Sequence, residues 1–71
     1  MSICIIIQNH GVYYRSRGKE MSSKVADELI QHLSLGIDSF TMECGDNPNR
    51  KHQFSAKVLA NSVISYEVLG K

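Results

Sequence analysis

The longest apolar run in the chain, Ile3–Ile7, constrains the fold more than any other feature. Its four isoleucines and one cysteine leave no polar side chain on either alternating face. A strand of this kind is covered on both faces, or buries one face against a partner. A run of five residues is too short for a membrane-spanning helix, which needs about 20. We therefore expect Ser2–Gln8 to be a central strand, and we expect no membrane association.

The length of the chain, 71 residues, predicts one domain that spans residues 1–71. A domain of this size buries only about 60% of the surface that its unfolded chain exposes, so its core is thin. Help from a disulfide, a metal or a second subunit is common at this size. A symmetric dimer would cover the second apolar face of the first strand. We therefore expect a homodimer.

One hairpin and three further strands are expected from the patterns along the rest of the chain. The turn Asn9–Gly11 tolerates positive φ, so Val12–Arg17 should return antiparallel to the first strand. In that second strand, Tyr13, Arg15 and Arg17 share one face. The three other segments that we expect to be extended are Ser39–Cys44, Gln53–Leu59 and Val63–Leu69.

A single amphipathic helix is expected between residues 23 and 35. Ser22 or Ser23 can accept a first-turn backbone N–H as the N-cap, and Gly36 can adopt the left-handed conformation that ends a helix. Apolar residues at helical spacing form one stripe, made of Val25, Ala26, Leu29, Ile30 and Leu33. The helix should therefore pack by one face only.

Together these elements predict an α+β fold: a small antiparallel β-sheet of four to five strands with one helix packed on one face, in the order ββαβββ. The C-terminal third has a second interpretation. Ala56, Leu59, Ala60 and Val63 also fit the spacing of a helix. β-branched and aromatic residues are frequent between residues 63 and 68, and this composition favours strands.

The residue types that carry catalysis or bind metals are scattered along the chain. His10, His32 and His52 lack the i, i+4 spacing of a helical metal site, and Cys44 with His52 is a lone couple. Cys4 and Cys44 lie in apolar strand patterns, where we expect buried, reduced thiols. No serine stands in a Gly-x-Ser-x-Gly motif, and the glycines do not form a phosphate-binding loop. We therefore expect no enzymatic activity, no metal and no cofactor.

The formal net charge of +1 conceals a segregation of charge along the chain. Residues 26–46 carry five acidic residues and no Lys or Arg, whereas the segments on either side are basic. An acidic patch attracts a basic protein surface and repels nucleic acid. The acidic residues that we expect to bind a protein partner are Asp27, Glu28, Asp38, Glu43 and Asp46.

By elimination, we expect a small non-enzymatic protein-binding module that inhibits or modulates a larger protein or complex. The N-terminus has no basic leader before an apolar stretch, so we expect a cytoplasmic protein. Small free-standing domains of this kind are common among accessory proteins of phages and mobile elements, and we expect that origin.

The alternative function is RNA or DNA binding through a sheet face that carries tyrosine and arginine. Alternating aromatic and guanidinium groups can stack on bases and contact phosphates. The near-neutral net charge argues against this function, because phosphate neutralisation supplies most of the affinity of nucleic-acid binders. The candidate residues of this face are Tyr13, Arg15, Arg17, Arg50, Lys51 and Lys57.

Overall fold

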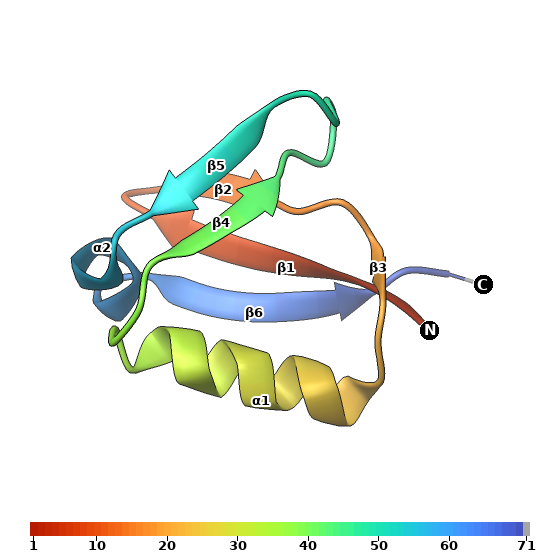
Figure 1. Cartoon of the computed structure of the whole chain (residues 1–71), viewed down its shortest axis with the longest axis horizontal. Helices are drawn as coiled ribbons and strands as arrows, with labels where there is room; N and C mark the ends of the chain where they lie inside the picture. The colour runs from red at the N-terminus through yellow and green to blue at the C-terminus, as the bar shows by residue number, and fades with distance from the viewer. Residues whose placement is uncertain (71) are drawn as a thin grey trace.

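Six strands and two helices follow one another along residues 1–70, the part of the chain that the computed structural model describes (Figure 1). The strands form one sheet of four and one sheet of two, both antiparallel, so the predicted α+β class is confirmed. In chain order the elements are β1 (Ser2–Asn9), β2 (Val12–Arg15), β3 (Lys19–Glu20), α1 (Ser23–Ser34), β4 (Phe40–Glu43), β5 (Lys51–Phe54), α2 (Ala56–Ala60) and β6 (Val63–Val68).

The apolar strand β1 is the centre of the larger sheet, as its composition predicts. One of its edges pairs with β6, and the other edge is shared by β2 and the two-residue β3. Ile6, for example, lies between Arg15 of β2 and Ser65 of β6. Ile3 and Ile7 are fully buried. The short strand β3 was not predicted, because two residues are too few for any alternating pattern to be visible.

The turn between β1 and β2 has the backbone that the sequence predicts for a tight hairpin. His10 and Gly11 both have positive φ, at 52° and 78°, as in the hairpin turns that match the twist of the strands. The second strand is shorter than the predicted Val12–Arg17. It ends at Arg15 because Ser16 forms an isolated bridge with Cys44, which turns the chain toward β4.

Helix α1 begins and ends close to the predicted positions. The Ser22 hydroxyl accepts a hydrogen bond from the backbone N–H of Val25 at 3.2 Å, so Ser22 is the N-cap. The apolar stripe is narrower than predicted, because Val25 at its edge is exposed while Ala26 and Leu33 are buried. The helix therefore packs on the larger sheet by one face, mainly against β6 and β1.

The larger sheet has four strands, within the predicted four to five, but the prediction that all strands join one sheet is wrong, because β4 and β5 form a two-stranded sheet of their own. They pair with each other in a register that sets Phe40 opposite Phe54. The hairpin joins the end of β2 through the isolated Ser16–Cys44 bridge and two neighbouring backbone hydrogen bonds. In Figure 1 this hairpin crosses over the β1–β2 side of the larger sheet. The physical reason is coverage: one helix covers only part of the sheet, and the hairpin buries Met42 and Phe54 over the rest.

The predicted strand Gln53–Leu59 is also wrong beyond Phe54, where the chain forms the short helix α2. Ser55 is its N-cap, since its hydroxyl accepts the backbone N–H of Val58 at 3.2 Å. Leu59 is fully buried, whereas an alternating strand would point it outward. The helical interpretation is therefore correct for residues 56–60, and the predicted last strand is confirmed as β6.

The hydrophobic core lies on one face of the larger sheet. It is lined by side chains from β1, α1, the β4–β5 hairpin and α2: Ile5, Ile7, Leu33, Met42, Phe54 and Leu59. We call the opposite face, which carries Ile6 and Tyr13, the open face. None of the helices in residues 1–70 is long and apolar enough to cross a membrane.

Candidate ligand-binding site

The open face of the larger sheet carries two of the residues that the sequence singled out. Strand register aligns Tyr13 with Gln8 and Val63, and aligns Arg15 with Ile6 and Ser65. Directly paired residues project from the same face of a sheet. Tyr13 is 66% exposed and Val63 is 65% exposed, so both remain accessible on this face.

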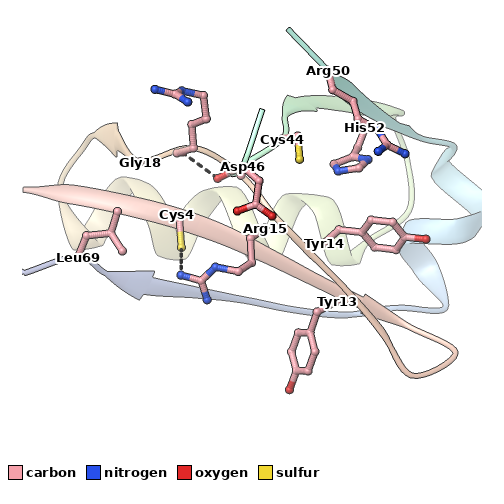
Figure 2. Close-up of a pocket in the computed structure, with 13 residues that line it drawn as sticks. Cys4, Tyr13, Tyr14, Arg15, Gly18, Cys44, Asp46, Arg50, His52 and Leu69 are labelled. Carbon is pink, nitrogen blue, oxygen red and sulfur yellow. Dashed lines mark hydrogen bonds between the residues drawn. The ribbon is translucent and has the colours of Figure 1, made fainter. Parts of the chain in front are cut away.

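A hollow of about 400 Å³ lies beside this face, between β2 and the β4–β5 hairpin (Figure 2). Its lining combines cationic, aromatic and thiol side chains with one carboxylate. The chemically active residues of the lining are Cys4, Tyr13, Tyr14, Arg15, Arg17, Cys44, Asp46, Arg50 and His52. The hollow wraps around the outer edge of β2, so side chains from both faces of this strand line it. The Ser16–Cys44 bridge fixes the other wall close to this edge.

Arg15 is held across the sheet by two partners. Its Nη2 donates to Glu67 Oε1 at 2.8 Å and to Cys4 Sγ at 3.4 Å. The hydrogen bond with Glu67, together with the charge interactions with Cys4 and Glu67, raises the pKa of Arg15 above its ordinary value. Figure 2 shows the guanidinium extending from β2 toward the Cys4 thiol. Arg15 is therefore a permanent, oriented positive charge at the start of the hollow.

The two other arginines of the hollow are positioned by backbone hydrogen bonds. The N–H of Arg17 donates to the carbonyl of Glu43 at 3.2 Å, and the carbonyl of Arg50 accepts the N–H of Cys44 at 2.8 Å. Arg17 Nε lies 4.0 Å from Glu43 Oε1, which is a loose ion pair. Among residues 1–70, Arg50 forms no ion pair. Of the three arginines, Arg50 therefore has the fewest interactions with other side chains of the protein.

Tyr14 of β2 and His52 of β5 give the hollow an aromatic wall. The ring of Tyr14 packs edge-on against His52 and Phe54, with centroid distances of 5.1 and 5.2 Å. Tyr14 and His52 are half-buried, so part of each ring surface remains accessible to a ligand. This wall offers flat apolar surface next to the arginines.

The six residues of the predicted basic face do not all meet. Tyr13, Arg15, Arg17 and Arg50 line the hollow, whereas Lys51 and Lys57 do not. Lys51 pairs with Glu43 across the β4–β5 ladder, and Lys57 lies on α2. Sequence reasoning missed Tyr14, His52 and Asp46 as part of the hollow. Alternation assigned Tyr14 to the face of the second strand opposite Tyr13 and Arg15, and no local signal indicates that the β4–β5 loop folds back onto β2.

The five acidic residues are distributed over two sides of the molecule. Asp27 and Glu28 lie on α1, whereas Glu43 and Asp46 lie at the end of β4 and in the loop after it, on the other side of the molecule in Figure 1. Asp38 Oδ2 lies 3.1 Å from His32 Nε2. Two of the five, Glu43 and Asp46, thus lie beside the arginines of the hollow, and they lower its positive charge.

Neither cysteine is in a disulfide, and both line the hollow. Cys4 is buried, as predicted, but Cys44 is half-buried because it lies at the end of β4 rather than inside it. Across residues 1–70, no three His, Cys, Asp or Glu side chains are grouped so that they could hold a metal ion.

The hollow brings guanidinium groups and aromatic side chains into one lining. Three guanidinium groups can each donate to phosphate or carboxylate oxygens in a forked geometry. Comparison of the chain with protein-family models, with curated proteins and with solved structures found no match.

Proposed function

We propose that this protein binds a single strand of RNA or DNA at the hollow and the adjoining open face. The observation that carries the proposal is that Arg15, Arg17 and Arg50 all line one hollow. Tyr13 adds a largely exposed ring beside these cations. Backbone phosphates would contact the arginines, and an unstacked base would lie on the ring of Tyr13.

A single strand fits this arrangement better than a duplex. Bases in a duplex are already stacked on their neighbours, so an isolated tyrosine ring on a sheet can contact only a base that is free to turn outward. Ile6 and Val63 extend the open face next to Tyr13 and Arg15, and provide apolar surface under such a base. The small net charge of +1 implies modest affinity, because few phosphates are neutralised.

Binding of a protein partner through the acidic residues stays a prediction and receives less support from the contacts. Asp38 already faces His32 within the chain, and the five acidic residues are divided between two sides of the molecule instead of forming one patch. A homodimer that buries the open face also stays a prediction, as do an inhibitory role, a cytoplasmic location and a phage or mobile-element origin. A dimer built on the open face would compete with the nucleic acid for Tyr13.

Fluorescence anisotropy with labelled octamers of uridylate and of thymidylate tests the proposal. Each phosphate contact to a single strand contributes a slope of about −0.7 to the dependence of log affinity on log salt. Three contacts therefore predict that affinity falls about 20-fold when salt rises from 50 to 200 mM. Affinity that does not change with salt would overturn the assignment of phosphate contacts to the three arginines.

Substitutions locate the binding surface. Arg50→Ala should weaken binding severalfold and reduce the salt slope by about 0.7, since one phosphate contact is lost. Lys57→Ala is the matched control, because it removes one exposed positive charge that lies outside the hollow. Equal losses in the two variants would mean that net charge alone attracts the strand. An acidic peptide that displaces the octamer, and that binds with the same affinity as the octamer, would instead indicate a protein ligand.

A further inference from the structure

A second recess, separate from the hollow, lies between α1 and the strands β1, β3 and β4. Its volume is about 140 Å³. Its walls are largely apolar and come from four different parts of the chain: Ile5, Met21, Leu29, Phe40 and Met42. Ile5 and Met42 are buried, and the other three are half-buried, so the recess reaches from the core to the surface.

The size and lining of the recess suit one small apolar group. An apolar cavity of about 150 Å³ in a folded protein stays dry and accepts a benzene-sized molecule. Water gains little in such a space, because it finds few hydrogen-bond partners there. The methionines Met21 and Met42 can adapt their side chains to a ring and make favourable sulfur–aromatic contacts. A single aromatic ring therefore fits both the volume and the chemistry.

The mouth of the recess is mainly cationic. Arg17 and Lys19 line it together with Glu43. A shallow hollow next to it shares Lys19 and Glu43 and adds Lys51, which pairs with Glu43 across the ladder. Three positive charges thus surround one negative charge. In the part of the chain that the structure describes, Lys19 and Lys51 form no ion pair.

We propose that the recess binds a small aromatic carboxylate, such as a benzoate or phenylacetate type of molecule. The ring would occupy the apolar part, and the carboxylate would lie at the mouth between Arg17 and Lys19. The charge at the mouth selects an acid over a neutral ring. This site does not depend on the proposed binding of nucleic acid, and the two share only Ser16 and Arg17 in their linings.

Titration of ¹⁵N-labelled protein followed by ¹H–¹⁵N NMR tests this site with four probes: benzoate, phenylacetate, benzyl alcohol and acetate. Benzoate or phenylacetate should saturate at millimolar concentration and shift the amides of Leu29, Phe40 and Met42. Benzyl alcohol should bind at least threefold more weakly because it lacks the charge. Acetate should produce no saturable shift because it lacks the ring.

Variants separate the ring site from the mouth. Leu29→Phe should fill the recess and abolish saturable binding of both aromatic acids. The control Leu35→Phe makes the same change at a leucine of the helix end that is 67% exposed, and it should leave binding unchanged. Lys19→Gln, an exposed substitution that needs no repacking, should weaken benzoate severalfold and leave benzyl alcohol unaffected.

The proposal fails if benzoate binds Leu29→Phe as it binds the unmodified protein, or if acetate saturates as tightly as benzoate. It also fails if Lys19→Gln weakens both rings equally, which keeps the test decisive should Leu29→Phe not fold. Octamer binding measured in parallel keeps the two sites distinguishable, since Leu29→Phe should not alter it.

Discussion

Replacement of Leu59 by alanine tests the short helix α2, because strand and helix predict opposite orientations for this residue. In the structure Leu59 is 0% exposed and Val58 is 40% exposed. In a strand that continued the alternation of Phe54, the side chain of Val58 would be inside and that of Leu59 outside. Leu59→Ala should therefore be costly, and Val58→Ala should be mild.

The expected magnitudes follow from burial. Truncation of a fully buried leucine costs about 3–5 kcal/mol through lost transfer energy and the cavity left behind. A domain of this length has a free energy of unfolding of about 4–11 kcal/mol, so Leu59→Ala removes a large part of it. Val58→Ala should cost less than about 1 kcal/mol, because Val58 is only partly covered and alanine favours the helix.

Urea unfolding followed by far-UV circular dichroism measures both variants. With a slope near 1 kcal/mol per molar urea, typical of small domains, the midpoint of Leu59→Ala should fall by about 3 M and that of Val58→Ala by less than 1 M. Leu59→Met, which nearly conserves volume, should retain most of the stability and shows whether the site tolerates any change. A larger loss for Val58→Ala than for Leu59→Ala would refute the helix at residues 56–60.

Three further predictions address the site, a glycine and a tyrosine. Glu67→Gln removes the carboxylate that holds Arg15 at 2.8 Å, so octamer affinity should rise in the anisotropy assay; a decrease would show that the pair orients Arg15 for binding. Gly36→Ala should lower the urea midpoint by at least about 1 M, because Gly36 has a φ of 66° and an added Cβ would lie 2.5 Å from Ala60 Cβ. The interaction with Asp27, together with partial burial, raises the pKa of Tyr66 above its ordinary 10.0, so this contribution stabilises the fold below pH 10 and is lost as the pH rises through the raised value. Urea unfolding between pH 9 and 11 should show this loss in the unmodified protein and not in Tyr66→Phe.

Several elements of this fold could be predicted because their signals are local. The run Ile3–Ile7 is apolar on both faces, and β1 is indeed the central strand. Ser22 caps α1, and Gly11 has the positive φ that its hairpin turn requires. In each case a few neighbouring residues set the periodicity or the backbone angle, and they need no distant contact to do so.

The second sheet and α2 could not be predicted in this way. Phe54, Ala56 and Val58 alternate in sequence, yet only Phe54 lies in a strand. Ser55 caps a helix instead, and Leu59 then packs in the core with Leu33 of α1 and Ile7 of β1. Five residues fit either pattern, so burial against distant residues decides between them.

The candidate site, like the fold, could be predicted from the sequence only in part. Alternation alone assigned Tyr13 and Arg15 to one face of β2, and strand register agrees. The sequence does not show that Arg50 lines the same hollow as Arg15, or that the predicted acidic patch is split between two sides of the molecule. These outcomes depend on where the β4–β5 hairpin packs, and the Ser16–Cys44 bridge joins residues 28 positions apart in the chain. Local sequence thus determined the central strand, its hairpin turn, the first helix and the residues that share a face of β2. The tertiary structure decided which charges meet, because that depends on long-range packing that no short segment encodes.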